Sequence, residues 1–394
     1  MDLTVKDFLD FDYFSSLEVI AGAEGLSRSA DSCAFLDYEL DKTLNQKYAN
    51  RNFRPGQMVI TSLMFARDDP FLIRDAVKYV ISKGCSALII KNVYRLPIHD
   101  YILRYADSKK FPILIMTDMQ MHFDGFTIQV NKCVETAKDA EAAERALGRL
   151  LYQPLDLSEK KNDIRTLFPR FYNQYVILYC HAGRAVDAGS VQQLHHRLRQ
   201  SVRQDESARV LRYQTGLFLF LSGDALGSAA SELYSPMLTN QFPGGAVGIS
   251  ALHIHPEEID AALREAMYAA RIHRLNLRMR SGREQPCCTY EQMGVYRALL
   301  PMLDSEELQR YSGDLLDPIL EFDAENRGNL LDTLLEFVQY GGNLHELSAQ
   351  SGQHENTLRY RLDKIGSLTG LSYRKLDDYE QLALAARVYL LLNH

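Results

Sequence analysis

Residues 341–370, with the sequence GGNLHELSAQSGQHENTLRYRLDKIGSLTG, predict the local fold of the C-terminal part of the chain. Asn343 predicts the start of a helix over 344–351, because its side-chain oxygen can accept a hydrogen bond from a free amide of the first turn. Gly352 follows that helix and can adopt the left-handed conformation that lets the chain turn sharply. The stretch therefore predicts two short helices that meet at a steep angle.

The second helix of this stretch starts at His354 and has two distinct faces. Its buried stripe carries apolar residues at helical spacing, namely Leu358, Leu362 and Ile365. The opposite face is polar and comprises Glu355, Asn356, Arg359, Tyr360 and Asp363, with Arg361 and Lys364 on its flanks. A small residue, a glycine and an apolar residue at positions five, nine and fifteen are the steric requirement of a helix-turn-helix, and here they are Ser348, Gly352 and Leu358. Residues 343–366 are therefore a predicted helix-turn-helix.

The polar face of the second helix suits the recognition of double-stranded DNA. Asn and Arg side chains pair bidentately with adenine and guanine edges, and hydroxyl groups bind phosphates. The candidate DNA-binding residues are His354, Asn356, Thr357, Arg359, Tyr360, Arg361 and Lys364. On spacing alone, a plain helical hairpin with a solvated polar face fits as well, and that interpretation stays open. Two members also have alternatives, because His354 suits a helix-start hydrogen bond and Tyr360 suits packing.

The charge of the whole chain is unfavourable for a DNA-binding protein. The formal net charge is −7, and residues 329–394 hold six Lys and Arg against eight Asp and Glu, a balance of −2. Residues 354–366 hold three cations against two acids, a balance of +1. DNA contact depends on the local field at one face and not on the average over the chain. We therefore expect one copy to bind weakly, and a homodimer or higher homo-oligomer to be needed because it multiplies the contacts.

Residues 1–122 alternate between short β-rich runs and amphipathic segments. The predicted strands lie at 17–23, 30–36, 57–63, 86–91 and 111–117. The predicted helices lie at 70–83 and 99–109. Alternating strands and helices are typical of a mixed α/β sheet with parallel pairs, so we expect an N-terminal α/β sensory domain here.

Residues 123–160 are the expected helical linker. Apolar residues recur at helical spacing through 124–152, from Val130 to Leu150. Two interpretations are open: this helix packs on its own domain, or it pairs with the same helix of a second subunit. The polar, proline-containing stretch 153–163 marks a domain boundary.

Residues 161–285 predict a central α+β domain. Its elements run in the order strand, helix, two hairpin strands, helix, strand and a further helix, which is a ferredoxin-like order. They lie at 175–180, 191–204, 209–213, 217–221, 226–240, 246–250 and 256–275. Residues 286–394 are expected to be helical to the end. The predicted fold class is therefore multidomain, α/β and α+β, with a C-terminal all-α domain.

Targeting signals are not evident in the sequence. The first residues are acidic where a signal peptide is basic, and the longest apolar runs are far shorter than the roughly 20 residues that span a membrane. We therefore expect a cytoplasmic protein that does not engage a membrane. The hydrophobic fraction of 46% and charged fraction of 24% are ordinary for a globular chain and argue against wholesale disorder.

Metal and redox sites are also not expected. No two of the six cysteines have C-x-x-C spacing, so no disulfide framework, structural zinc or cofactor is predicted. The adjacent Cys287 and Cys288 are interpreted as small hydrophobic residues, with redox activity as the alternative. His253 and His255 could ligate a metal, but without a third ligand nearby they are expected to be exposed loop histidines. The pair His195 and His196 is interpreted in the same way.

The run HENTLRYRL at 354–362, followed by Leu-Thr-Gly at 368–370, resembles the C-terminal helix-turn-helix of the purine catabolism regulator family and its sugar-diacid regulator relatives. LTVKD at 3–7, EVIAG at 18–22 and RPGQMVIT at 54–61 resemble the family's N-terminal domain, so the resemblance covers essentially the whole chain. It implies an oligomeric DNA-binding transcription regulator. It also implies a small-molecule effector and control of a catabolic pathway, with purine or related nitrogen metabolism as the expectation.

The chain departs from this family at three positions around the turn. Ser348, Ser351 and Gln353 stand where the family usually has Ala, Leu and Val. An unpaired polar group near a small core costs about 1–3 kcal/mol. We therefore expect some of these side chains to be exposed or hydrogen-bonded.

The central region weakly resembles the GGDEF-type domain of diguanylate cyclases, including EAMYAAR at 265–271. After Arg212-Tyr213, where cyclases carry GGDEF, this chain has QTGLF, which places Gly216 and Leu217 at the acidic positions. Phosphoryl transfer needs carboxylates that hold metal ions. We therefore predict a degenerate domain used for packing or oligomerisation, with no catalytic residue and no enzyme activity. The alternative for the whole chain is a signalling scaffold whose C-terminal helices bind a protein partner instead of DNA.

Overall fold

The structure is a computed structural model of the chain. It describes residues 3–37, 53–168, 170–172, 174–183, 186, 188–201, 206–224, 226, 233–278 and 286–393. The chain forms two compact units, Met1–Arg145 and Ala146–His394. Each unit has its own sheet and its own apolar core.

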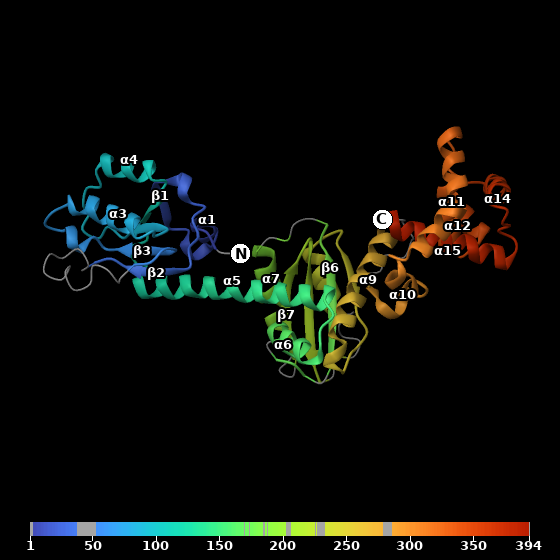
Figure 1. The fold of residues 1–394 in the computed structure, drawn as a ribbon, viewed down its shortest axis with the longest axis horizontal. Helices are drawn as coiled ribbons and strands as arrows, with labels where there is room; N and C mark the ends of the chain where they lie inside the picture. The colour runs from blue at the N-terminus through green and yellow to red at the C-terminus, as the bar shows by residue number, and fades with distance from the viewer. Residues whose placement is uncertain are drawn as a thin grey trace. The chain divides into compact units, whose positions relative to one another are not determined.

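The first unit is built on a five-stranded sheet in the order β1-β5-β4-β3-β2 (Figure 1). The strands are β1 (Leu17–Ala21), β2 (Ser32–Phe35), β3 (Gln57–Thr61), β4 (Ala87–Ile90) and β5 (Ile113–Met116). Strands β2 to β5 run parallel, and β1 pairs antiparallel with β5. The predicted mixed sheet with parallel pairs is therefore confirmed, with all five strands in the predicted places.

Both faces of this sheet are covered. Val59 and Leu88 pack on one side with helices α3 (Leu72–Ser82) and α4 (Asp100–Ser108). Met58 and Ile89, one position along each strand, pack on the other side with α1 (Val5–Leu9) and the start of α5. Successive strand residues point to opposite faces, so strands buried on both sides appear in the sequence as continuous apolar runs.

Helix α5 (Phe123–Tyr152) is thirty residues long and continues from the first unit into the second. Phe126 and Val130 pack in the core of the first unit, whereas Leu147 and Leu150 are buried further along. Ala140, between these segments, is exposed although the sequence pattern includes it in the apolar stripe. Packing on its own domain therefore describes the first part of the helix, and pairing between subunits stays a prediction.

Helix α6 (Leu157–Leu167) follows α5 in the second unit and overlaps the stretch 153–163 that the sequence marks as a boundary. Asp156 caps it, and Lys160 anchors it to the start of α9 (Ile259–Arg278) through a 2.7 Å ion pair with Asp260. Arg264 also bonds Asp260, at 2.7 Å. This cluster connects the two ends of the central region.

The sheet of the second unit has the order β10-β9-β6-β8-β7. Its strands are β6 (Gln174–His181), β7 (Glu206–Tyr213), β8 (Gly216–Gly223), β9 (Ala246–Ile249) and β10 (Cys288–Thr289). Helices α7 (Ala188–Ser201) and α8 (Ser235–Gln241) pack on one face, through residues such as Leu194 and Leu238. The predicted helix at 226–240 lies partly outside the described residues.

Helix α9 covers the other face, and a glycine permits its close approach. A Cβ atom at Gly248 in β9 would lie 2.0 Å from the Ala270 nitrogen and 2.2 Å from the Ala266 oxygen. Only a residue without a side chain therefore allows the strand and the helix to pack at this distance.

The prediction of helix alone after residue 286 is wrong at β10. Cys288 and Thr289 pair in parallel with Gly248 and Ile249 of β9. Two residues are too few to form a strand pattern in the sequence, so only the tertiary pairing reveals them.

The helical domain follows β10. Its helices are α10 (Tyr296–Leu299), α11 (Glu306–Asn326), α12 (Leu330–Gln339), α13 (Leu344–Ser351), α14 (Glu355–Thr369) and α15 (Leu376–Asn393). Helices α11 to α15 share one core around Leu334 and Leu362. The last turns of α15 also pack against α9, where Val388 and Leu391 meet Ile272 and Leu275 (Figure 1). Among the described residues, no helix has the length and apolar character needed to cross a membrane.

Candidate nucleic-acid interface

Helices α13 and α14 and the turn between them form the predicted helix-turn-helix. Asn343 caps α13, and its Oδ1 accepts hydrogen bonds from the amides of His345 (3.1 Å) and Glu346 (3.2 Å). Gly352 ends α13 with a φ of 70°, in the left-handed region. His354 caps α14, and its Nδ1 accepts from the Asn356 amide at 3.2 Å. His354 therefore makes the hydrogen bond at the start of the helix that its position in the sequence suits.

The packing of the two helices follows the predicted stripe. Leu347 of α13 and Leu358 of α14 are fully buried, and so are Leu362 and Ile365. A further apolar side chain of α13, Leu344, is partly buried against the same core. A fixed core of this kind holds α14 in one orientation, so its polar side chains are presented in a defined pattern.

The polar residues of the turn are hydrogen-bonded to one another. The Ser348 hydroxyl donates to the Gln353 carbonyl oxygen at 2.7 Å. The Ser351 hydroxyl accepts from the Gln353 amide at 3.4 Å. The Gln353 side chain accepts from Arg361 at 2.7 Å. These bonds offset the desolvation of the polar groups that replace the family's apolar residues.

Arg361 lies on the side of α14 next to the core. Besides its bond to Gln353, its Nη1 donates to the Thr333 hydroxyl of α12 at 3.3 Å. Its guanidinium therefore connects α12, the turn and α14. The structure does not bring Arg361 together with the exposed members of the predicted set.

The outward face of α14 is formed by four exposed residues of the predicted set: Asn356, Thr357, Arg359 and Tyr360. Tyr360 is 72% exposed, so the interpretation that it packs against the domain is wrong. An exposed tyrosine has a free hydroxyl for a phosphate or a base edge. The amide, hydroxyl, guanidinium and phenol groups together can both donate and accept hydrogen bonds.

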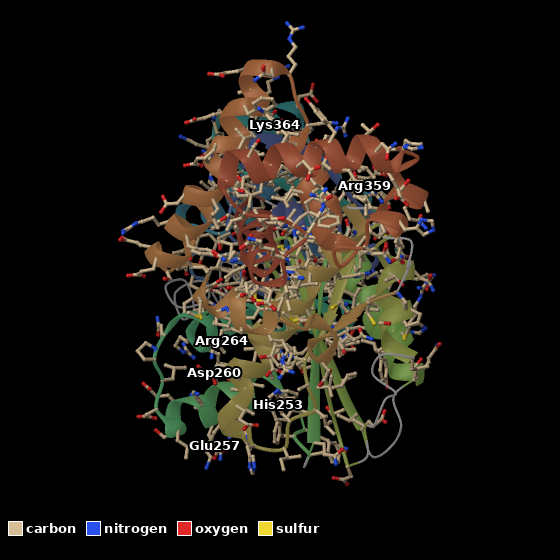
Figure 2. All side chains as sticks on the ribbon, turned by 90° about the vertical axis from the view of Figure 1, so that its right-hand side faces the viewer. His253, Glu257, Asp260, Arg264, Arg359 and Lys364 are labelled. Carbon is tan, nitrogen blue, oxygen red and sulfur yellow. The ribbon has the colours of Figure 1, made fainter. Side chains whose placement is uncertain are left out.

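Lys364 is half-buried at the flank of this face. Its Nζ lies 4.8 Å from the centre of the Phe322 ring of α11, which places the ammonium group over the aromatic face. Figure 2 labels Lys364 and Arg359 on the helical domain, apart from the group of His253, Asp260 and Arg264. A lysine stem that packs on apolar surface can still present its charge to solvent.

Both carboxylates of α14 are paired with cations. Glu355 bonds Arg359 at 3.0 Å and His345 at 3.1 Å. The pKa of Glu355 is lowered, mainly by the hydrogen bond from His345. Asp363 bonds Arg374 at 2.9 Å. His345 and Arg374 lie outside the predicted set, because nothing in the local sequence indicates which distant acid they meet. The pairing screens the acids that would otherwise repel a polyanion.

The hairpin of the central region occupies the place that the sequence resemblance gives to the GGDEF motif. The hairpin at Tyr213 and Gly216 carries no acid at the two cyclase positions, and no cluster of metal-ligating side chains occurs in the described part of the chain.

His253 is 8% exposed, so the expectation of an exposed loop histidine is wrong for it. Its ring nitrogens lie 3.0 Å from Glu258 and 2.9 Å from Glu265. His255 is exposed as expected.

The adjacent cysteines are buried. Cys287 and Cys288 are 8% and 6% exposed, and burial raises the pKa of both thiols, that of Cys288 to about 12. A thiol with a raised pKa is a poor nucleophile at neutral pH. The two residues therefore act as small hydrophobic side chains in the cores of the second unit.

The fold and this face define a multidomain protein with a C-terminal helix-turn-helix domain. Residues 330–388 match the PucR C-terminal helix-turn-helix domain, and residues 7–134 match the Purine catabolism regulatory protein-like family. Both terminal regions of the chain thus match models of the purine catabolism regulator type, as the sequence resemblance implies.

Two relatives from Bacillus subtilis (strain 168) have described roles. The proline-responsive transcriptional activator PutR is 24% identical over 245 residues, which cover 59% of this chain and 58% of PutR. The DNA-binding transcriptional activator AdeR is 21% identical over 89 residues, which cover 23% of this chain and 21% of AdeR. The chain therefore matches little more than half the length of the first and about a fifth of the second. The matched families and these relatives are transcriptional regulators, not enzymes, in agreement with the prediction.

A solved structure is also similar. The crystal structure of a regulator of polyketide synthase expression from Bifidobacterium adolescentis shares 19% identity. The similarity covers 65% of this chain and 95% of that chain, with a TM-score of 0.32.

Proposed function

We propose that the chain is a transcription regulator that inserts α14 into the major groove of double-stranded DNA. The observation that carries the proposal is the exposed polar face of α14, held by a fully buried stripe and with both of its acids paired to cations. Residues of this kind on a recognition helix suit base edges and phosphates. The matched helix-turn-helix domain supports the same function.

The seven predicted residues divide into three roles in this proposal. Asn356 and Arg359 read base edges, since amide and guanidinium groups pair bidentately with adenine and guanine. Thr357, Tyr360 and Lys364 contact phosphates at the edges of the groove. His354 and Arg361 belong to the same DNA-binding set, and they act by holding the start and the side of α14 in place.

The protein acts as a homodimer or higher oligomer in this proposal, because a single face with a small positive balance binds DNA weakly. An effector changes the spacing of paired recognition helices, and the proline-responsive activity named for PutR supports an effector response. The regulated pathway is catabolic, in purine or related nitrogen metabolism. The protein works in the cytoplasm.

The domain organisation belongs to the proposal as well. We assign residues 1–122 to the sensory domain, 123–160 to a helical linker, 161–285 to a central domain and 286–394 to the helical domain. The strand order β9-β6-β8-β7 supports a ferredoxin-like, degenerate cyclase-like fold for the central domain. Its role is packing or oligomerisation.

The test is selection of DNA from a random library by the full-length protein. The matched comparison is an Asn356→Ala, Arg359→Ala double variant, with Arg104→Ala as control because Arg104 is an exposed arginine on α4 of the other unit. We expect a motif with two half-sites, an affinity at least about tenfold lower for the double variant, and no change for the control.

Salt dependence distinguishes the two functional classes. The affinity of a protein for DNA falls steeply as the salt concentration rises. Each phosphate contact makes the slope of log K against log salt concentration more negative by about 0.9. A double variant that selects the same motif as tightly as the wild-type protein would contradict the residue assignment. If the full-length protein enriches no sequence at low salt, with or without candidate effectors, the signalling scaffold replaces the DNA-binding regulator.

A further inference from the structure

A cavity of about 180 Å³ lies where α9 of the central region meets α12 and α15 of the helical domain. Four residues of its wall are apolar, namely Ile272, Leu275, Val338 and Leu390. The other three are polar, namely Tyr296, Gln339 and Arg387, so apolar and polar surface contribute about equally to the wall. Apolar side chains with a few convergent polar groups also line small-molecule sites.

One polar group of the wall lacks the partner that buried groups normally have. The Gln339 Nε2 atom is buried and makes no hydrogen bond within the described part of the chain. Arg387 shares a hydrogen bond with Tyr296. It forms none of the ion pairs found among the described residues, so no carboxylate there lies within 4.0 Å of its guanidinium. A buried donor without an acceptor is costly, and native structures usually satisfy it with water or a ligand.

A second arginine, on α9, lies beside the end of α15 that contributes to the cavity. Arg271 on α9 is half-buried, and its guanidinium donates to the Leu391 carbonyl at the end of α15. Burial and the neighbouring Arg274 lower the pKa of Arg271, while Asp304 opposes the shift. Burial also raises the pKa of Tyr296, so its phenol stays neutral beside Arg387. An anion that enters this junction therefore meets arginines and hydrogen-bond donors.

We propose that this cavity binds a small organic anion, with its carboxylate on Arg387 and the Gln339 amide. The apolar body of the ligand rests on the wall formed by Ile272 and Leu275 of α9 and Leu390 of α15. The volume sets the size of that body, since an apolar cavity of about 150 Å³ holds one benzene molecule. The ligand class is therefore a monocarboxylate with a body of about six carbons or fewer.

The position of the cavity connects it to the helix-turn-helix. Val338 and Gln339 are the last residues of α12, and Asn343, four positions further, caps α13. Leu334 and Leu335 of the same helix pack in the core that holds α14. A ligand on Gln339 thus contacts the helix that supports the recognition helix. This coupling, unlike the binding itself, rests on the proposed function.

The binding experiment is calorimetric titration of the full-length protein with propionate, isovalerate and benzoate, and with benzamide as the uncharged analogue of benzoate. We expect at least one carboxylate to bind with a stoichiometry of one per chain, and benzamide to bind at least about tenfold more weakly than benzoate if benzoate binds. Arg387→Met should weaken binding by a similar factor, and Arg387→Lys should restore part of it. Arg310→Met, at an exposed arginine of α11, is the matched control and should bind as the wild type does.

Thermal unfolding without ligand shows whether the variants fold, and Gln339→Leu gives a second test should Arg387→Met be unstable. The proposal is overturned if no carboxylate binds up to about 10 mM, a range in which weak small ligands are detected. It is equally overturned if folded Arg387→Met and Gln339→Leu bind as tightly as the wild type. DNA affinity measured with and without the bound carboxylate tests the coupling separately, so a failure of DNA binding leaves the ligand site intact.

Discussion

Arg361 donates a 2.7 Å hydrogen bond to the side-chain oxygen of Gln353, across the turn of the helix-turn-helix. The same guanidinium nitrogen reaches Thr333 of α12 at 3.3 Å. A residue that looks like a DNA contact in the sequence therefore also holds the motif together. The turn carries Gln353 where related proteins usually have an apolar residue. Its side-chain oxygen needs a hydrogen-bond donor, and Arg361 supplies that donor.

Replacing Arg361 by Met should destabilise the helical domain by about 1–2 kcal/mol, because the half-buried Gln353 oxygen loses a charged donor. Hydrogen exchange of the α13 and α14 amides measures this locally, without assuming two-state unfolding of the whole chain. In Gln353→Val the same arginine substitution should cost less, since no acceptor is left unpaired. Equal costs in both backgrounds would show that the bond does not stabilise the turn.

Replacing Glu355 by Gln should increase the affinity for random-sequence DNA severalfold at low salt. The substitution removes one acid from the face of α14 and releases Arg359 from its 3.0 Å ion pair, which as an exposed pair contributes little to stability. Fluorescence anisotropy with a labelled duplex measures the affinity. Glu144→Gln, an exposed acid on α5, is the control with the same change of charge. An equal gain for both variants would attribute the effect to net charge alone.

The stability of the second unit should depend on the protonation of His253. Burial by itself lowers the pKa of this imidazole, but the hydrogen bonds with Glu265 and Glu258 outweigh burial and leave the pKa raised. A raised pKa in the folded state gives a contribution to stability that is complete below the ordinary value of about 6.5 and is lost as the pH rises through the folded value. The hydrogen bond to His253 also lowers the pKa of Glu258, and that contribution is lost as the pH falls below the ordinary glutamate range.

Urea midpoints of the wild type and of His253→Gln, measured between pH 5 and pH 9 in steps of about one unit, test this dependence. The difference between the two proteins should be largest at the acidic end of that range and should shrink toward pH 9. A difference that does not change with pH would mean that folding leaves the pKa of this imidazole unchanged, and a difference that grows toward pH 9 would mean that folding lowers it.

Replacing Gly248 by Ala should destabilise the second unit by about 1–3 kcal/mol or more, because the new methyl group overlaps the backbone of α9 at Ala270. Thermal unfolding reports the loss. The matched control is Gly148→Ala in α5, where nothing lies within 4 Å of the new Cβ. That control should be neutral or stabilising by about 0.5–1 kcal/mol, as expected for glycine within a helix. A tolerated alanine at 248 would mean that α9 and β9 pack less closely than described.

Features of this protein that depend on neighbours a few positions away are predictable from its amino-acid sequence alone. The Asn343 cap, the left-handed Gly352 and the apolar spacing of Leu358, Leu362 and Ile365 define the helix-turn-helix. Apolar runs such as the one at β3 define the strands of the first unit. These signals are local because capping, turn conformation and helical or strand periodicity involve residues within one or two turns of the chain.

The tertiary structure determines the contacts between residues that are distant in sequence. It placed Arg361 on Gln353 and Thr333, paired Asp363 with Arg374, added β10 beside β9, and buried His253 between Glu258 and Glu265. It also assembled the cavity around Gln339 and Arg387 from four helices. A polar side chain can have several possible partners in the sequence. It bonds the partner that packing brings within hydrogen-bond distance, and this proximity exists only once the helices and sheets have assembled.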